Sequence, residues 1–312
     1  MCEENQTQVT QIWLLGFQSL HKYRSPLFIV FLLTYLFILG GNLLIILLVT
    51  IIDHLKTPMF LFLKHLSIAD VLLTTTVVPM MLDIIFVKKV ILSFWGCILQ
   101  LYLFCLFGFI QCYLIAVMSY DRYLAICHPL RYSSLMGPEL CLQLVIGSWV
   151  LISIIESSEI LVLIQFTFCG LNSIDHFFCD FGPMVELATS DTSILINLDF
   201  VFSIFVIFCP FVFIIVTYIC IMFSILKISS TFGRRKAFST CSSHLVTVCM
   251  YYGTLITVYM APSDQSSSYI NKYRSLLYIV VTPLLNPIIY SLRSHEIKTA
   301  MEKTISRIFQ NA

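Results

Sequence analysis

Two adjacent charges at the end of a long apolar stretch are the first candidates for a functional role. Asp121 and Arg122 lie in the run Met118–Cys127, which continues directly into His128-Pro129-Leu130-Arg131-Tyr132. The apolar stretch begins near Cys97, so the pair falls at the edge of a predicted membrane span, where unpaired charge is costly. The alternative is a boundary ion pair in another kind of membrane protein.

Further acids lie inside apolar stretches. Glu156 and Glu159 are three residues apart and therefore share a helical face, which could serve a proton relay or a transporter site. A transporter should also show paired repeats with broken helices, which the sequence lacks. We therefore interpret these two acids as polar packing near the outer end of a helix. Asp70, near mid-membrane, is equally well explained as a functional carboxylate or as a protonated structural one.

The run His176-Phe177-Phe178-Cys179-Asp180 could be read as a metal site, because imidazole and thiolate are zinc ligands. One histidine with acids is a poor ligand set, and Cys179 is expected to be oxidised, so no metal is predicted. The chain also lacks a phosphate-binding glycine loop and a zinc-protease motif. No catalytic constellation is present, so neither an enzyme nor a cofactor is expected.

The composition is that of a membrane protein: 59% of residues are hydrophobic and only 11% are charged, with a mean hydropathy of +0.93. A membrane-spanning helix needs about 20 mostly apolar residues. The runs that qualify are continuous rather than alternating, which predicts helices rather than a closed barrel. They cover residues 26–52, 58–82, 97–120, 140–165, 194–226, 237–260 and 270–292.

The distribution of positive charge predicts the orientation. With the N-terminus outside, twelve of the 18 Lys and Arg residues fall on the cytoplasmic side, and loop 166–193 has four acids and no Lys or Arg. This asymmetry supports an extracellular N-terminus, and seven spans place the C-terminus in the cytoplasm.

Asn5-Gln6-Thr7 is a glycosylation motif on the outer side, and residues 1–25 lack the pattern of a cleavable signal peptide. Because the net charge is only +1, nucleic acid is not an expected partner.

Several motifs agree on a family. The string from Met118 to Tyr132, the element Lys236-Ala237-Phe238-Ser239-Thr240-Cys241 and the segment Asn286-Pro287-Ile288-Ile289-Tyr290 closely match family signatures. The chain resembles the vertebrate olfactory receptors of the tetrapod (class II) branch, within the rhodopsin-like G-protein-coupled family, over about residues 10 to 305. The resemblance implies an all-α seven-transmembrane-helix bundle in the plasma membrane.

The expected organisation is a single receptor domain, 1–312. It comprises an extracellular N-terminus (1–25), the bundle (26–292) and a cytoplasmic tail (293–312). In the tail, Ile297, Met301, Ile305 and Ile308 recur at helical spacing, with basic residues off that stripe. This pattern predicts a short amphipathic helix lying on anionic membrane lipid.

The resemblance also implies a ligand site between the outer halves of spans three, five, six and seven. A mostly apolar lining suits a small, weakly polar odorant held by contact area and one or two polar groups. Ser203 and Tyr259 would supply those groups, and Phe104 occupies the position of the acid in amine receptors. The implied lining is Phe104, Cys105, Gly108, Phe109, Phe202, Ser203, Val206, Ile207, Leu255, Ile256, Tyr259 and Ile279.

The implied partner on the cytoplasmic side is a heterotrimeric G protein of the stimulatory olfactory type, which raises cyclic AMP. The implied switch residues are Asp121, Arg122, Tyr218, Asn286 and Tyr290. A polar core of Asn42, Asp70 and Asn286 is expected at the bundle centre, a cluster that often holds sodium in the wider family. Gln111 stands there in place of the usual Glu, so the cluster has one acid fewer. The alternative function, a channel or transporter, would need a polar path, and the available acids are scattered.

Cysteines on the outer side are disulfide candidates because that compartment is oxidising. The candidates considered are Cys97, Cys169 and Cys179. The family pattern pairs Cys97 with Cys179, tying the top of span three to the long loop. It also pairs Cys169 with a cysteine at position 189, where this chain has Thr189. Cys169 is therefore expected to be free or paired elsewhere.

Overall fold

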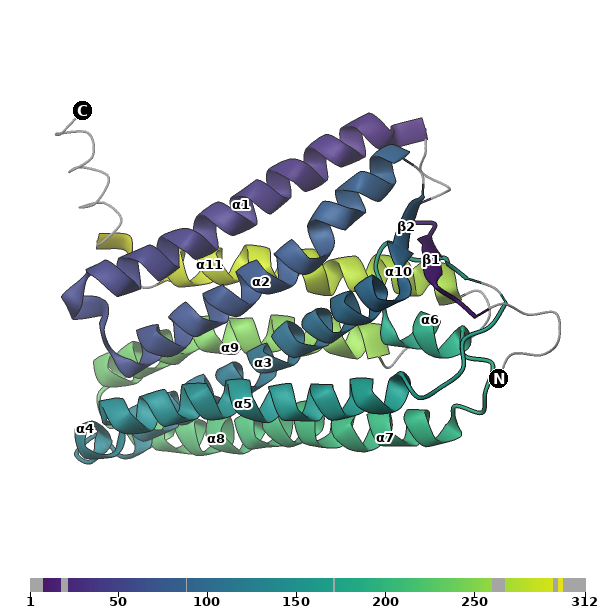
Figure 1. Ribbon diagram of the computed structural model, residues 1–312. Coiled ribbons are helices and arrows are strands. Elements are labelled where there is room, and N and C mark those ends of the chain that lie inside the picture. Colours follow the sequence, from purple (N-terminus) through teal and green to yellow (C-terminus); the bar gives the residue numbers. More distant parts are fainter. Residues whose placement is uncertain are drawn as a thin grey trace.

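The computed structural model describes residues 8–17, 22–87, 89–170, 172–259, 267–293 and 297–299. Within these residues, long helices run side by side along one axis (Figure 1). Four of them are single helices: α1 (Arg24–Ile51), α2 (Pro58–Val87), α3 (Phe94–Cys127) and α5 (Pro138–Leu163). The fifth segment joins α7 (Ser193–Ser203), the π-helical turn η3 (Ile204–Phe208) and α8 (Cys209–Leu226). The sixth is α9 (Thr231–Tyr259), and the seventh joins α10 (Ser267–Leu276), the π-helical turn η4 (Leu277–Val281) and α11 (Thr282–Arg293).

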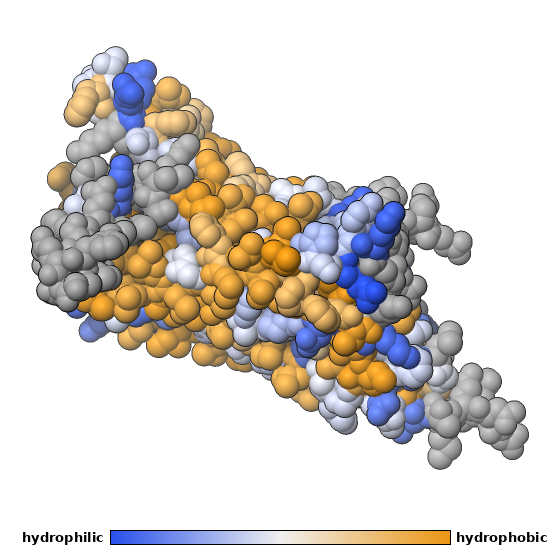
Figure 2. Space-filling model, turned by 90° about the horizontal axis from the view of Figure 1, so that it is seen from above, coloured by the Kyte–Doolittle hydropathy of each residue, from blue (hydrophilic) through white to orange (hydrophobic). Residues whose placement is uncertain are grey.

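Each predicted apolar stretch corresponds to one of these segments, which confirms the seven-helix architecture. Five segments are long and apolar enough to cross a membrane, namely α1, α2, α3, α5 and Ser193–Leu226. Large apolar side chains such as Leu33 and Phe37 on α1 are more than half exposed. In Figure 2, apolar residues spread across the middle of the visible face and hydrophilic ones gather toward the ends. That distribution fits a lipid-facing surface, because lipid tails are as apolar as these side chains.

The third helix is the centre of the bundle. Helix α3 packs against α2, α5, α8 and α9. It begins three residues before the predicted apolar stretch, 97–120, and continues seven residues beyond it to Cys127. Asp121 and Arg122 therefore lie within the helix rather than after it. The two charges neutralise each other, so the helix does not have to end where the apolar run ends.

A small sheet covers one end of the bundle. It contains β1 (Gln11–Leu14), β2 (Val90–Ser93) and β3 (Ser173–Ile174), in the order β2-β1-β3. Strand β1 pairs antiparallel with β2 and parallel with β3. We call this end, which carries the three strands, the strand end. The sequence analysis predicted no sheet, because strands of two to four residues are too short to show an alternating pattern.

The opposite end carries shorter elements. They are the turn η2 (Asp53–Leu55) and the helix α4 (Tyr132–Leu135). We call it the Asp-Arg end, because Asp121 and Arg122 lie there. The predicted amphipathic helix in 293–312 falls largely outside the described residues: only 297–299 are described, as helical, with Ile297 buried.

Candidate functional site

The predicted ligand site begins with a close contact between α3 and the seventh segment. Gly108 is buried, and a Cβ atom there would collide with the hydroxyl group of Tyr278 in η4. The hydroxyl of Tyr251 in α9 donates a 2.8 Å hydrogen bond to the Gly108 carbonyl oxygen. A glycine at this position therefore lets three helices meet, with two tyrosine side chains directed at one point of α3.

Aromatic side chains cover this point, and we call the part of the long loop that carries Phe178 the roof. The long loop places Phe178 over Phe104 of α3, with ring centroids 4.7 Å apart. Phe104 also makes an edge contact with Tyr278, at 6.0 Å between centroids. The sequence analysis named Phe104 and Gly108 but missed Phe178, Tyr251 and Tyr278. Phe178 could have been found from its place beside Cys179, because a disulfide there must bring it close to α3.

The twelve predicted lining residues differ in burial. Phe104, Gly108, Val206, Leu255 and Ile279 are buried, whereas Cys105, Phe109, Phe202, Ser203 and Ile207 are partly buried. Ile256 is 46% exposed, unlike its neighbour Leu255 at 3%. The side chain of Tyr259 lies outside the described part of the structure.

A disulfide bond fixes the roof. Cys97 and Cys179 are bonded, with Cα atoms 5.5 Å apart, as the family resemblance implied. The backbone N–H of Cys179 donates to the side-chain oxygen of Gln100 at 3.0 Å, which gives the same loop a second attachment to α3. Because Cys179 is oxidised, it offers no thiolate for the metal site considered at His176.

A half-buried ion pair joins the loop to the seventh segment. The Lys272 ammonium lies 2.6 Å from Asp175 Oδ1 and donates to the Gly16 carbonyl oxygen at 2.7 Å. Its side chain is 4% exposed, whereas that of Asp175 is 51% exposed. Gly16 has a φ of +59°, and a Cβ there would collide with Ile84. Glycine is therefore required where the N-terminal strand meets both α2 and Lys272.

Burial shifts the pKa of two titratable groups in the loop. His176 packs against Phe177 and Phe178, with ring centroids 4.7 and 4.6 Å away. Burial, and secondly the charge of Lys272, lowers the pKa of His176 to about 3. Burial raises the pKa of Asp180 to about 6, although its carboxylate accepts a hydrogen bond from the Phe181 N–H at the start of α6 (Phe181–Glu186).

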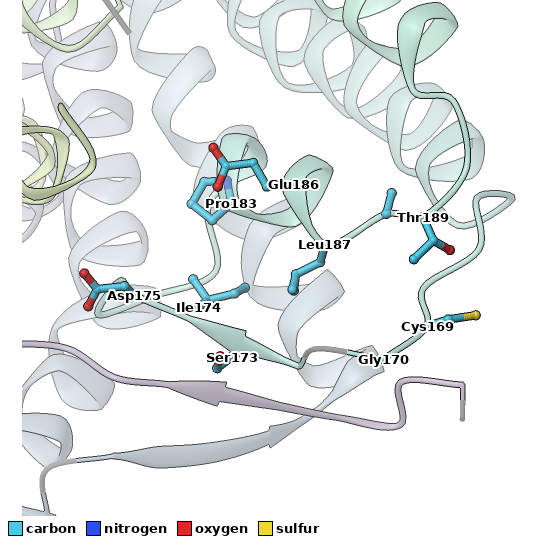
Figure 3. Close-up of a pocket in the computed structure, with 10 residues that line it drawn as sticks. Cys169, Gly170, Ser173, Ile174, Asp175, Pro183, Glu186, Leu187 and Thr189 are labelled. Atoms are coloured by element: carbon cyan, nitrogen blue, oxygen red, sulfur yellow. The ribbon is translucent and has the colours of Figure 1, made fainter. Parts of the chain in front are cut away.

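A cavity of about 740 Å³ lies beside this loop at the strand end, between β3 and α6 (Figure 3). It shares no residue with the twelve predicted lining residues, so it is distinct from the predicted ligand site. Its lining carries two acids and no basic residue. The residues that line it are Cys169, Gly170, Ser173, Ile174, Asp175, Pro183, Glu186, Leu187, Ala188 and Thr189.

The polar residues at the bundle centre are buried and join different helices. The amide nitrogen of Asn286 donates to Asp70 Oδ2 at 2.9 Å, linking α11 to α2. That of Asn42 donates to the Pro283 carbonyl oxygen at 3.0 Å, linking α1 to α11. Gln111 is fully buried, and its side-chain amide makes no hydrogen bond with the described residues.

At the Asp-Arg end, the ion pair lies within α3. Arg122 Nη2 is 2.5 Å from Asp121 Oδ2, and the Tyr132 hydroxyl donates to Asp121 Oδ1 at 2.7 Å. Asp121 is therefore held by its neighbour on the helix and by α4. The pairing keeps Arg122 directed at its own helix.

A hydrogen-bonded histidine joins three helices nearby. His244 of α9 lies 3.1 Å from the Ile115 carbonyl oxygen through Nε2, and 2.6 Å from the Tyr218 hydroxyl through Nδ1. Because a carbonyl only accepts, Nε2 carries the proton and Nδ1 accepts from Tyr218. Ser119 and Thr217 form another hydrogen bond between α3 and α8. The sequence analysis named Tyr218 but gave His244 no role, although a histidine within an apolar span was a visible signal. Tyr290 is buried.

Comparisons with known proteins decide the family. The sequence profile described as olfactory receptor matches residues 31–308. The chain belongs to the olfactory receptor family. It is 46% identical to olfactory receptor 5P81 of Mus musculus over 96% of both chains. It is 44% identical to olfactory receptor 10A7 of Homo sapiens, over 97% of this chain and 96% of that one.

A solved structure supports the fold. The crystal structure of squid rhodopsin superposes with a TM-score of 0.70 at 19% identity, covering 92% of this chain and 87% of the rhodopsin chain. The receptor is therefore a multi-pass membrane protein with the rhodopsin-like fold, and members of its family are receptors rather than enzymes.

Three acids of the receptor lie on the neighbouring helices α5 and α7. Glu156 and Glu159 of α5 are buried, and Glu159 shares a side-chain hydrogen bond with Asp199 of α7. A hydrogen bond between two carboxyl groups requires one proton. The hydrogen bond joins α5 to α7; the interpretation of the two glutamates as polar packing stays a prediction.

Proposed function

We propose that this olfactory receptor binds a small, mostly apolar odorant inside the outer half of the bundle and activates a stimulatory olfactory-type G protein. The observation that carries the proposal is the group formed by Phe104, Gly108, Tyr278 and the roof residue Phe178. Aromatic faces and edges favour an apolar ligand, and the tyrosine hydroxyls could orient one polar group.

The chemistry of the lining argues against a charged ligand. Phe104, at the top of this group, is only 6% exposed and is surrounded by rings. Placing a charge there without a partner would be costly. An odorant with one hydroxyl, carbonyl or ether oxygen fits this environment best.

The orientation follows from charge. The strand end includes loop 166–193, which has no Lys or Arg, whereas Arg122, Arg131 and Arg234 belong to the Asp-Arg end. We place the strand end outside the cell and the Asp-Arg end in the cytoplasm. The odorant then reaches the receptor beneath the roof, and the G protein binds where Asp121 and Arg122 lie.

Signalling requires that the ligand favour one of two arrangements of the bundle. Tyr251 of α9 contacts α3 at Gly108. His244, about two turns nearer the start of α9, contacts α3 at Ile115. A ligand that shifts Tyr251 or Tyr278 would therefore act on the same helix that carries the histidine. The movement opens the cytoplasmic ends of α3, α8 and α9 to the G protein.

The test is a screen of a chemically broad odorant panel in cells that express the receptor and the olfactory G protein. Odorants with an apolar body should raise cyclic AMP in wild type and leave the membrane current of cells lacking the downstream channel unchanged. An odorant-evoked current that persists without the G protein would instead indicate a channel. Cyclic AMP responses confined to permanently charged compounds would contradict the proposed ligand class.

A further inference from the structure

We propose that an anionic phospholipid binds in a groove between α8 and α9, with an acyl chain along α8 and its phosphate at the basic residues where the two helices are joined. The groove has a volume of about 440 Å³. Six residues of α8 between Ile215 and Leu226 line it, together with Leu245 of α9. All of them are apolar except for the hydroxyl group of Tyr218. We call this feature the α8–α9 groove.

The α8–α9 groove lies on a lipid-facing surface. Ile219 is 50% exposed, Phe223 63% and Leu226 59%, and lipid tails are as apolar as these side chains. Ile215 and Leu226 are eleven positions apart, which at 1.5 Å per residue corresponds to about 16 Å along the helix. That length is about half of the ~30 Å hydrocarbon core of a bilayer. The groove therefore has the depth of one leaflet and suits an acyl chain.

One end of the groove meets a cluster of positive charge. Lys227 follows Leu226 directly, Arg234 and Arg235 lie in the first turns of α9, and all three are exposed. The sequence from 200 to 263 contains four Lys or Arg residues and no Asp or Glu. No carboxylate of this segment therefore competes for the cations. Clusters of Lys and Arg directly beside a membrane span favour anionic over uncharged lipid headgroups.

The start of α9 adds to this cluster. The Gly233 N–H donates to the Ser230 hydroxyl at 3.0 Å, and Arg234 Nη2 donates to the Ile228 carbonyl oxygen at 3.1 Å. The second bond uses one of the five N–H donors of the guanidinium group and holds it against the link between the helices. A phosphate bound there would also meet the positive end of the α9 dipole. Phe232, which is 79% exposed beside these cations, can enter the bilayer next to the headgroup.

The groove also includes a residue of the implied switch. Tyr218 lines it, and the hydroxyl group of Tyr218 donates to His244 Nδ1 at 2.6 Å. Leu245, on the α9 side of the groove, follows His244 in the chain. An acyl chain in the groove would therefore contact both helices beside the hydrogen bond that joins them. That this lipid belongs to the inner leaflet rests on the orientation proposed above, whereas its binding does not.

The experiment reconstitutes the full-length receptor in phosphatidylcholine nanodiscs that contain a phosphatidylserine with a diazirine in one acyl chain. After illumination, peptide mapping by mass spectrometry should find this lipid attached between Ile215 and Leu226 or at Leu245. Labelling there should exceed that by a phosphatidylcholine with the same diazirine at least about fivefold, the effect of one basic residue near an anionic surface. The measurement needs neither odorant nor G protein, so its failure is distinguishable from failure of the proposed function.

Two results of this mapping would overturn the proposal. Equal labelling of the groove by the two lipids would show a general lipid contact without preference for an anionic headgroup. A groove that stays unlabelled while other lipid-facing surfaces are labelled would show that something else covers it, such as a second copy of the receptor.

Charge variants test the headgroup site. Combining Lys227→Gln, Arg234→Gln and Arg235→Gln should lower phosphatidylserine labelling of the groove to the phosphatidylcholine level. The matched control combines Lys56→Gln with Arg131→Gln, because both are exposed cations elsewhere at the same end of the bundle. The control should label as wild type does. Wild-type labelling of the triple variant would overturn the assignment of the headgroup.

A second pair of variants tests the acyl-chain site. Ile219→Trp should fill the groove and lower labelling by both lipids severalfold. Val216→Trp adds the same ring to α8 at a position that is 52% exposed but does not line the groove, so it should leave labelling unchanged. Equal labelling of the two tryptophan variants would overturn the placement of the chain.

Discussion

The two ends of the bundle are held together by different kinds of interaction. At the strand end, a disulfide bond, a three-stranded sheet and a half-buried ion pair join the N-terminal segment, two loops and two helices. At the Asp-Arg end, side-chain hydrogen bonds join α3, α8 and α9. The strand end has a covalent link between segments 82 residues apart in the chain, and the described cysteines of the Asp-Arg end are free.

The difference shows how one fold can serve both binding and switching. A covalent roof keeps the aromatic group around Phe104 in place before a ligand arrives, which reduces the entropy lost on binding. Hydrogen bonds contribute about 0.5–1.5 kcal/mol each. Breaking a few of them is within reach of a ligand whose affinity differs between two states by several kcal/mol.

The largest expected effect comes from removing the disulfide at the strand end. Cys97→Ser or Cys179→Ser should abolish delivery to the cell surface, because losing such a bond costs about 2–5 kcal/mol. Cys209→Ser is the matched control, since Cys209 is free and exposed, and it should reach the surface normally. Surface staining of unfixed cells measures the result, and normal staining of Cys179→Ser would show that the roof does not depend on this bond.

Cys169→Ser should have a smaller effect on delivery to the cell surface than loss of Cys97 or Cys179. Without a partner at position 189, loss of Cys169 would be expected to matter little, but the residue is disulfide-bonded. We expect surface staining between those of wild type and Cys97→Ser, because the Cys97–Cys179 bond remains. Staining equal to that of Cys209→Ser would mean that the bond at Cys169 adds nothing to folding.

At the Asp-Arg end, Arg122→Ala should separate coupling from folding. The side chain of Arg122 pairs with Asp121 of its own helix, so its loss breaks no ion pair between helices. The variant should reach the surface and give no odorant-evoked cyclic AMP. Lys56→Ala controls for loss of a surface cation, since Lys56 is exposed and pairs with the exposed Asp53. Wild-type cyclic AMP from surface-expressed Arg122→Ala would remove Arg122 from the switch.

His244→Phe tests whether hydrogen bonds hold this end. The ring can stay stacked on Tyr218, but two hydrogen bonds are lost, a cost of about 1–3 kcal/mol. Amide hydrogen exchange should become faster in the neighbouring parts of α3, α8 and α9 and stay unchanged in β1 and β2. Equal acceleration at both ends would show that the ends are not independent.

His176 should make the strand end sensitive to acid. Its pKa in the folded receptor is about 3, below the ordinary value of about 6.5, so its stabilising effect is complete above pH 6.5 and is lost progressively as the pH falls toward 3. At pH 5 the loss is about 2 kcal/mol. Asp180, whose pKa is raised to about 6, acts in the opposite sense between about pH 6 and 4.

Comparing wild type with His176→Phe isolates the histidine, because Asp180 is present in both. Hydrogen exchange of the loop Cys179–Glu186 in wild type should accelerate between pH 7 and 5 relative to the variant, after correction for the intrinsic rate. Identical pH profiles would show that protonation of His176 does not oppose the folded loop.

The smallest effects are expected in the ligand site. Tyr259→Phe removes only a hydroxyl group and should cost an odorant that accepts its hydrogen bond about 0.5–1.5 kcal/mol. That is a several-fold to about tenfold shift of the dose-response curve. A hydrocarbon ligand should be unaffected, whereas Leu255→Ala should weaken apolar ligands. Unchanged potency of every agonist in both surface-expressed variants would mean that the site lies elsewhere.

How far the sequence predicts this molecule depends on the length scale of the signal. Long apolar runs predicted the helices closely, because each run must satisfy its own backbone in lipid. The disulfide between Cys97 and Cys179 followed from family resemblance. The sheet was missed because its strands are short and pair across loops, and the Lys272–Asp175 contact joins residues 97 positions apart.

The most direct test of the difference between the two ends is hydrogen exchange of the full-length receptor in lipid nanodiscs, with and without an agonist from the screen and the G protein. We predict changed deuterium uptake from Ile115 to Tyr132 and in the adjoining parts of α8 and α9. Uptake in β1, β2 and the loop Cys179–Glu186 should stay the same or fall slightly. Increased uptake across the strand end, with none at the Asp-Arg end, would contradict a fixed roof above a reversible switch.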